Sequence, residues 1–284
     1  MGKDASPLNP KTKRKPILLR MILTVLTLFV LLCVVGCALQ RKLIYFPTKL
    51  TPTAAAQVAA EGGFLPWKNK EDKIIGWYLP AKGASTGSVL VIHGNAGYAL
   101  NRSYFAQPIH EAALVDVYIL EYPGFGAREG SPSMKSFLEA ADEAFDMLPD
   151  KTPRYVVSES IGTGPATYLA KSHSRDVAGF ALFVPYNDFV SLGKARMPFL
   201  PVSLILLDRY DPAKWISEYS GPIKFVVAEN DEVIPAKFGL KLHDAFRGPK
   251  LLEVIPQAHH NDVSEQSPEW WNGVFSFWRQ HARP

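Results

Sequence analysis

The chain has 284 residues, of which 47% are hydrophobic and 20% charged, and its formal net charge is +4. This size and composition predict one globular domain with a short additional segment. Residues 1–20 carry a net charge of +5, which leaves the rest of the chain near neutral, at about −1. A near-neutral body excludes the basic surface that binds nucleic acid, so no nucleic-acid partner is expected. Both cysteines, Cys33 and Cys37, lie in one apolar stretch, so the body offers no disulfide and no cysteine cluster for a metal.

The first predicted element is an apolar run from Met21 to Leu39, which contains no charged residue. It is long enough to cross a bilayer as a helix. The basic residues before it predict a cytoplasmic segment at 1–20 and an extracytoplasmic body, on the periplasmic side if the source is bacterial. The run is interpreted either as an uncleaved signal anchor or as a lipoprotein signal. The second interpretation arises because Val34-Val35-Gly36-Cys37 resembles a lipobox, in which Cys37 is lipidated. The long basic segment favours the anchor.

Beyond the apolar run, short apolar strands alternate with helical segments. Strands are predicted at 73–79, 88–93, 115–120, 155–157, 179–184, 223–228 and 251–255, and helices at 135–148, from 165 onward and at 267–281. Nearly continuous apolar strands are typical of a parallel sheet covered by helices on both faces. The sequence therefore predicts an α/β fold over residues 43–284. The interval 191–221 breaks the alternation and is interpreted as a small lid over the site or as an ordinary surface excursion.

The stretch from Tyr155 to Gly164 has the layout of a nucleophile elbow, with a strand, a tight serine-containing turn and a helix. The usual elbow pattern is Gly-x-Ser-x-Gly, because the turn brings the positions two before and two after the nucleophile close together. Here the pattern is Ser158-x-Ser160-x-Gly162. If Ser158 were the nucleophile, Val156 would occupy a small-residue position. Ser160 is therefore the predicted nucleophile.

A serine nucleophile requires a base and an acid that orients the base. The strand at 223–228 leads into an acidic loop, where Asp231 is the predicted acid and Glu229 and Glu232 are alternatives. Asp188, after the preceding strand, is a further alternative. The strand at 251–255 leads into a histidine loop, where His260 is the predicted base and His259 its rival. The order Ser, acid, His, each after a strand, is the order expected in this fold.

The loop His93-Gly94-Asn95-Ala96-Gly97 follows a buried strand and contains small residues that let backbone N–H groups face a ligand. An oxyanion hole needs two such donors. The backbone N–H groups of Asn95 and Ile161 are the predicted pair. His93 then has a structural role in this loop and is not the base.

These motifs together resemble the α/β-hydrolases, within the group of small membrane-associated serine hydrolases that includes the depalmitoylating α/β-hydrolase-domain thioesterases. The matching pieces run in the expected order from about residue 43 to the end: Leu43-Ile44-Tyr45-Phe46-Pro47, His93 to Gly97, Glu121-Tyr122-Pro123-Gly124-Phe125-Gly126, Glu129-Gly130-Ser131-Pro132-Ser133, the elbow, Asn230-Asp231-Glu232-Val233-Ile234-Pro235 and His260-Asn261-Asp262. The resemblance implies Ser160 as nucleophile, Asp231 as acid and His260 as base. Two features depart from it, namely Ser158 in place of glycine and Pro123 in place of the arginine of the family's Asp-Tyr-Arg-Gly loop.

The sequence thus predicts a membrane-tethered serine hydrolase that cleaves a small-molecule or lipid ester, or a thioester, through an acyl-enzyme. No cofactor or metal is implied. A serine peptidase or amidase is the nearest enzymatic alternative, because the same three residues serve both reactions. A catalytically weak protein of the same fold that binds a lipid or envelope partner is the alternative of a different class, and Ser158 is the feature that keeps it open. Fold-level likeness does not give a substrate.

Overall fold

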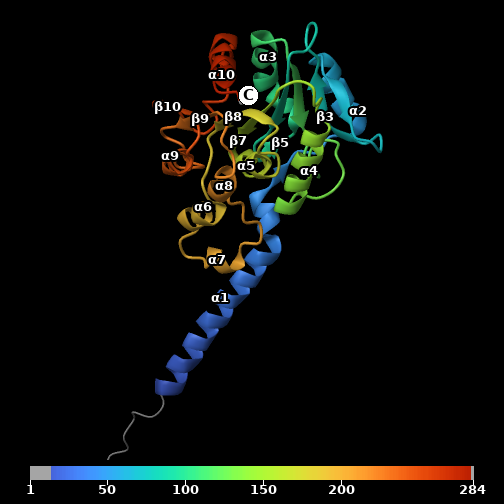
Figure 1. Cartoon of the computed structure of the whole chain (residues 1–284). Helices are drawn as coiled ribbons and strands as arrows, with labels where there is room; N and C mark the ends of the chain where they lie inside the picture. The colour runs from blue at the N-terminus through green and yellow to red at the C-terminus, as the bar shows by residue number, and fades with distance from the viewer. Residues whose placement is uncertain (1–13, 283–284) are drawn as a thin grey trace, which may run out of the picture.

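A computed structural model of the chain describes residues 14–282. Its centre is a sheet with the strand order β10-β9-β8-β7-β4-β6-β3-β2 (Figure 1). All neighbouring strands are parallel from β10 to β6, and β3 runs antiparallel to both of its neighbours. The strands are β2 (Leu65–Lys68), β3 (Ile74–Leu79), β4 (Ser88–Ile92), β6 (Asp116–Leu120), β7 (Arg154–Glu159), β8 (Val177–Phe183), β9 (Ile223–Ala228) and β10 (Lys250–Ile255). The prediction of a mainly parallel α/β sheet is confirmed.

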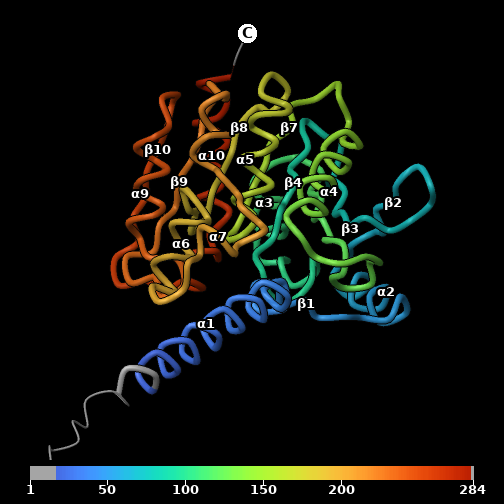
Figure 2. Tube along the Cα trace, turned by 90° about the horizontal axis from the view of Figure 1, so that it is seen from below, coloured from blue at the N-terminus to red at the C-terminus, as the bar shows by residue number. Residues whose placement is uncertain are grey.

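Helices cover both faces of this sheet, because successive strand residues point to opposite sides. In β4, Leu90 and Ile92 join the core on one face, whereas Val89 and Val91 join the core on the other. The first face is covered by α4 (Met134–Asp146), α5 (Thr163–Ser172) and α9 (Ala236–Ala245), and the second by α2 (Pro52–Glu61), α3 (Ser103–Ala112) and α10 (Pro268–Gln280). Figure 2 shows the strands side by side between these helices. The aromatic residues of α10 include Trp271 and Trp278, which are fully buried and belong to the core on the second face.

A long helix, α1 (Arg14–Ile44), leaves the body at one end (Figure 1). Ile17–Ile44 is long and apolar enough to cross a membrane, and no residue of its most apolar window is buried inside the body. The predicted run 21–39 lies within this helix. Of the predicted cytoplasmic segment 1–20, residues 1–13 lie outside the described residues.

Two short pairings connect the end of α1 to the body. The strand β1 (Phe46–Pro47) pairs with β5 (Ala96–Gly97), so the chain leaving α1 lies beside the loop that contains Asn95. Lys49 forms a further bridge with Gly126. The end of α1 is therefore fixed next to the carboxyl end of β4.

The interval 191–221 forms a small helical excursion between β8 and β9. It consists of the end of α6 (Phe189–Arg196), then α7 (Val202–Ile205) and α8 (Pro212–Ile216). The helix α8 packs on α5, and α7 packs on α1. We refer to residues 189–207 as the lid segment.

Candidate active site

Ser160 lies at the tip of a strained turn between β7 and α5. Its φ angle is +53°, in the left-handed region that side chains other than glycine rarely adopt. A one-turn 3₁₀ helix, Ser160–Gly162, leads directly into α5. A Cβ atom at Gly162 would lie 2.4 Å from the carbonyl oxygen of Ile92, so only glycine fits there. Ser158, in contrast, is a regular β7 residue paired with Ile92 and Leu182, and its Cβ is accommodated. The close approach to the backbone of Ile92 therefore occurs at Gly162, two residues after Ser160. It does not occur at Ser158, two residues before Ser160, so a serine is tolerated there.

The predicted acid and base meet Ser160 at the carboxyl edge of the sheet. His260 Nε2 lies 3.1 Å from Ser160 Oγ, and His260 Nδ1 lies 2.7 Å from Asp231 Oδ2. The other carboxylate oxygen of Asp231 accepts the backbone N–H groups of Val233 at 2.8 Å and Ile234 at 2.6 Å. All three side chains are buried. Because Asp231 is held by its own loop, it fixes the ring orientation in which Nδ1 donates and Nε2 can accept the serine proton.

The alternative acids and base lie elsewhere. His259 is exposed and its Nδ1 is 3.1 Å from Glu232 Oε2. The carboxylate of Glu229 accepts the N–H of Gln257, and Asp188 caps the first turn of α6. None of these groups contacts Ser160 in the described part of the chain. Asp231 and His260, the residues that the sequence favoured, therefore lie in line with Ser160, whereas the alternatives do not.

The loop after β4 lies on the other side of Ser160. Asn95, Ser160 and Ile161 all line one cavity, and the N–H groups of Asn95 and Ile161 stay the predicted oxyanion donors. The Asn95 side chain donates to the carbonyl oxygen of Ile44, so the end of α1 holds this loop. His93 is fully buried, with Nδ1 2.7 Å from the carbonyl oxygen of Gly94, and burial lowers the pKa of its imidazole. His93 therefore supports the loop from behind and does not reach Ser160.

A buried ion pair behind the elbow was not predicted from the sequence. The Glu159 carboxylate accepts hydrogen bonds from the hydroxyls of Ser264 (2.7 Å) and Tyr104 (2.9 Å), and lies 3.3 Å from Arg102 Nε. Burial favours the neutral carboxyl, but the charge of Arg102 and the two hydroxyls outweigh it and hold the pKa of Glu159 below its ordinary value. Glu159 also accepts the N–H of Gly94, which joins the elbow to the loop of Asn95. The only sequence signal for this pair was an acidic residue inside the elbow.

A cavity of about 300 Å³ extends from Ser160 between the lid segment and α1. The lid segment contributes Phe189, Leu192, Met197, Leu200, Val202 and Ile205. The helix α1 contributes Gly36, Gln40, Leu43 and Ile44. The sequence did not reveal that the predicted membrane segment would line the site, although Gln40 at the end of the apolar run is a polar residue that needs a partner.

Within residues 14–282, no group of three or more His, Cys, Asp or Glu side chains is arranged to hold a metal ion. Cys33 and Cys37 are both unpaired in this range and half-buried on α1. The carbonyl oxygen of Cys37 accepts a hydrogen bond from Gln40 Nε2.

The eight-stranded sheet, the positive φ at Ser160 and the acid and base loops define the α/β-hydrolase fold, which this chain shares with solved α/β-hydrolases. Solved structures with the same fold include Est1E from Butyrivibrio proteoclasticus with bound ferulic acid (TM-score 0.60, 14% identity, 72% of this chain and 95% of that one). Another is the monoacylglycerol lipase of Paleococcus ferrophilus (TM-score 0.56, 15% identity, 73% and 99% covered).

Among curated proteins, the chain is 31% identical to an uncharacterized protein of Mycobacterium tuberculosis, over 78% of this chain and 81% of that protein. It is 25% identical to the α/β-hydrolase domain-containing protein WAV2 of Arabidopsis thaliana, with 87% of both chains covered. It is 26% identical to protein bem46 of Schizosaccharomyces pombe, with 63% of both covered. No protein-family model matches the sequence. The resemblance predicted from the motifs is confirmed.

Proposed function

We propose that this protein is a membrane-anchored serine hydrolase that cleaves a carboxylic ester or thioester. The observation that carries the proposal is the placement of His260 between Asp231 and Ser160, at 2.7 and 3.1 Å. This arrangement supplies a nucleophile, a base and a group that orients the base, which acyl transfer requires. It favours an enzyme over a protein of this fold that only binds a lipid, because a binding site needs no such alignment.

In the proposed reaction, Ser160 Oγ attacks the carbonyl carbon while its proton passes to His260 Nε2. The N–H groups of Asn95 and Ile161 stabilise the oxyanion that forms. The C–O or C–S bond then breaks, and His260 donates its proton to the leaving oxygen or sulfur. His260 next removes a proton from water, which attacks the acyl-enzyme, and the carboxylic acid leaves as Ser160 regains its proton. Asp231 holds the imidazole and stabilises its cationic form at both stages.

An ester or thioester is the proposed substrate class because the cavity beside Ser160 is lined almost entirely by apolar side chains. An apolar pocket fits an acyl chain and offers few partners for a peptide backbone. The names of the solved structures include an esterase and a monoacylglycerol lipase, which support the same choice over an amide.

The anchor is proposed to be uncleaved, with residues 1–20 in the cytoplasm and the body on the opposite side of the membrane. Gly36 lines the cavity and Gln40 is hydrogen-bonded to the lid segment, so the chain on both sides of Cys37 belongs to the structure. Cleavage before Cys37 would remove part of the cavity wall. The absence of acyl modification in the purified protein, measured by intact mass, would support the anchor, whereas a mass corresponding to an N-terminal lipidated Cys37 would refute it.

The proposed mechanism is tested by hydrolysis of p-nitrophenyl acetate and butyrate by the full-length protein in detergent. We expect Ser160→Ala and His260→Ala each to lower kcat/KM by at least about a thousandfold, because each removes a member of one catalytic unit. His259→Ala is the matched control and should retain activity. A labelling reaction with a fluorophosphonate should modify the wild type and not Ser160→Ala. Hydrolysis retained by Ser160→Ala would refute the mechanism.

A further inference from the structure

The cavity beside Ser160 extends along the membrane-facing helix. Its lining includes Gly36, Gln40 and Leu43 of α1 together with Ser160 and Ile161 of the elbow. From Gly36 to Ile44 the helix advances about 12 Å at 1.5 Å per residue. Gly36 belongs to the apolar run 21–39. The cavity therefore connects the proposed nucleophile with the part of α1 that would face hydrocarbon.

The wall opposite α1 is formed by the lid segment, and it is mainly apolar. Leu192 and Val202 are buried there, and the charged Arg196 also lines this wall beside further apolar residues, namely Phe189, Met197, Leu200, Ile205 and Leu206. An apolar cleft of this kind, between a helix and a helical excursion, is suited to an alkyl chain.

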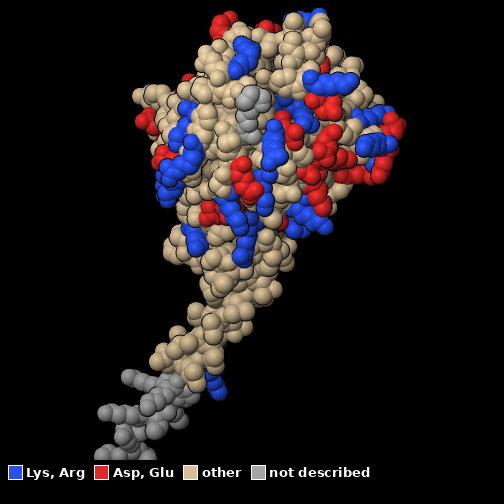
Figure 3. All heavy atoms as spheres, viewed as in Figure 1, with Lys and Arg blue, Asp and Glu red and all other residues tan. Residues whose placement is uncertain are grey.

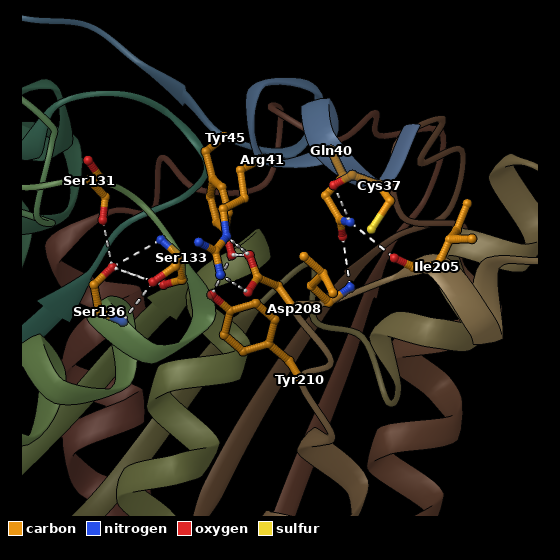
Figure 4. A network of polar contacts seen from close by, with 11 residues as sticks. Cys37, Gln40, Arg41, Tyr45, Ser131, Ser133, Ser136, Ile205, Asp208 and Tyr210 are labelled. Carbon is orange, nitrogen blue, oxygen red and sulfur yellow. Dashed lines mark hydrogen bonds and ion pairs between the residues drawn. The ribbon is translucent and has the colours of Figure 1, made fainter. Parts of the chain in front are cut away.

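Polar side chains clamp the lid segment to α1, so the cavity has a fixed wall (Figure 4). Gln40 donates from Nε2 to the carbonyl oxygen of Ile205 at 3.0 Å and accepts the N–H of Leu207 at Oε1 at 2.8 Å. Asp208, which is almost fully buried, accepts the hydroxyl of Tyr45 at 3.0 Å and pairs with Arg41 at 3.2 Å. The two Gln40 contacts satisfy backbone groups that would otherwise be unpaired in an apolar setting, and the Asp208 contacts pair a buried carboxylate.

Large apolar side chains face outward from the lid segment. Phe199 is 91% exposed and Leu204 is 79% exposed, and Met197 and Leu207 are also exposed. This surface adjoins α1, because α7 packs on that helix. Figure 3 shows uncharged atoms continuing from α1 onto the neighbouring end of the body. Large apolar side chains gathered on one surface are uncommon on a protein that faces only water. Because this surface continues from α1, we infer that it contacts the membrane leaflet into which the end of α1 would insert.

Basic residues lie next to this apolar surface in the sequence and on the outside of the fold. They are Lys42 on α1, Lys194 and Arg196 on α6, and Arg209 after the lid segment, all exposed, and Arg196 also lines the cavity. Lys and Arg beside an inserted apolar surface are placed for lipid phosphates. The exposed apolar side chains and the basic residues beside them therefore both indicate that this surface contacts a phospholipid leaflet.

We propose that the groove between α1 and the lid segment is an acyl-chain site that is loaded from the leaflet, so that the substrate is a long-chain ester resident in the membrane. The proposal rests on the proposed function, since the acyl carbonyl must reach Ser160. The anchor helix then has two roles, because it tethers the protein and forms one wall of the substrate site.

The direct test uses a hexadecyl fluorophosphonate with a diazirine at the end of its alkyl chain, applied to the full-length protein in phospholipid nanodiscs. Ser160 Oγ bonds to phosphorus, fluoride leaves, and the serine proton passes to His260. Irradiation should then crosslink the chain end to residues 36–44 or to the lid segment. Crosslinks confined to other parts of the chain would overturn the acyl-site proposal. Absence of phosphonylation at Ser160 would instead count against the proposed function.

A matched pair of variants provides a second test. A Cβ at Gly36 meets no atom within 4 Å and Gly36 lines the cavity, so Gly36→Trp should place its indole ring in the groove. We expect the ratio of kcat/KM for p-nitrophenyl palmitate to that for p-nitrophenyl butyrate to fall at least about tenfold, since several methylenes of the longer chain lose their apolar contact. Val34→Trp, on the exposed lipid face of α1, should not change this ratio.

Palmitate hydrolysis unaffected by Gly36→Trp would contradict the proposal. If Gly36→Trp lost activity toward both esters, the crosslinking of the wild type would still test the acyl-site proposal, because that experiment requires no substitution.

Discussion

At the residue scale, the departure of the elbow from its usual pattern has a local explanation. The backbone of Ile92 crowds Gly162 and not Ser158, so the steric demand of the turn falls on one flanking position. Ser158 is fully buried, and its hydroxyl has no hydrogen-bond partner within residues 14–282. A buried unsatisfied hydroxyl costs free energy of folding. Ser158 is therefore tolerated by the fold and is not required by it.

This leads to contrasting predictions for two alanine substitutions. Ser158→Ala should leave ester hydrolysis within about twofold and raise stability by up to ~1 kcal/mol, because it removes the unsatisfied hydroxyl. Gly162→Ala should lower stability by at least ~2 kcal/mol and reduce activity, because the new methyl group collides with backbone. Thermal unfolding in detergent and butyrate hydrolysis measure both effects. A strong loss of activity in well-folded Ser158→Ala would show that Ser158 has a role that the contacts do not reveal.

His93 provides a pH-dependent contribution to stability. Burial lowers the pKa of its imidazole in the folded protein, whereas the unfolded chain has the ordinary value of about 6.5. Below that pH the unfolded state binds a proton that the folded state does not, so the stabilisation is complete above pH ~6.5 and is lost as the pH falls toward the folded pKa. The slope contributed by this single group reaches at most ~1.4 kcal/mol per pH unit.

We therefore expect the unfolding temperature to fall between pH 7 and pH 5.5, and less steeply in His93→Asn, despite the lower overall stability of that variant. Glu159, whose pKa is lowered, keeps its stabilisation until the pH falls below the ordinary carboxyl range, so it does not contribute in this window. Equal slopes for the wild type and His93→Asn would contradict the assignment.

The site residues that lie in a recognisable sequence motif could be predicted from the sequence. Ser160, Asp231 and His260 follow strands, and parallel strands bring their carboxyl ends to one edge of the sheet. The sequence already favoured His260 over His259, and the structure adds that the loop directs His260 toward Ser160 and leaves His259 exposed beside Glu232. Arg102 and Glu159 pair across 57 sequence positions without a shared motif, so sequence spacing could not reveal their contact.

At the element scale, the predicted strands and helices agree with the structure to within two residues, because buried strands and amphipathic helices have strong patterns. The helix α2 and the short strand β2 were not predicted. The alanine-rich sequence of α2 has a weak apolar stripe, and β2 alternates over only four residues. The lid segment also lacked a clear pattern, because its helices are short and its apolar residues face both the cavity and the outside.

The clamp between α1 and the lid segment should contribute to stability. Burial raises the pKa of the Tyr45 phenol well above its ordinary value, so the hydroxyl remains a donor to Asp208. Asp208→Asn removes the charge that also attracts Arg41. We expect a loss of about 1–3 kcal/mol, since a buried charged acceptor is replaced by a neutral one, and a greater loss of palmitate than of butyrate hydrolysis.

The control for this substitution is Asp72→Asn, which breaks an exposed pair with Lys68 and should cost less than ~0.5 kcal/mol. The double variant Tyr45→Phe with Asp208→Asn should lose less than the sum of the two single losses, because both remove the same hydrogen bond. Additive losses would indicate that the two side chains do not act together.

At the scale of the whole molecule, the proposed anchor α1 and the lid segment would together bring the body against a membrane surface. The carboxyl edge of the sheet, where Ser160 lies, is the edge beside which α1 ends. A soluble ester can reach Ser160 without the lid surface, whereas an ester held in a bilayer requires the body to approach the leaflet. The two substrates should therefore respond differently to changes on the outside of the lid segment.

We expect the double variant Phe199→Asp with Leu204→Asp to lower hydrolysis of a long-chain ester in phospholipid vesicles by at least about tenfold, because each side chain loses ~1.5 kcal/mol or more of apolar burial in the interface. Hydrolysis of soluble butyrate should be unchanged, since neither residue lines the cavity. Leu114→Asp is the matched control. Leu114 is also an exposed apolar residue, and it lies just before β6, at the amino ends of the parallel strands and away from the lid segment.

Vesicle composition separates the apolar contribution from the electrostatic one. Anionic lipid should increase the activity of the wild type on the vesicle substrate, and salt should reverse that increase, because the basic residues around the lid segment each interact with a charged surface by about 1 kcal/mol. The aspartate variant should retain part of this salt sensitivity while its activity stays low. If the variant and the wild type hydrolysed the vesicle substrate equally, the lid surface would not contact the leaflet, and the anchor helix alone would have to bring the substrate to Ser160.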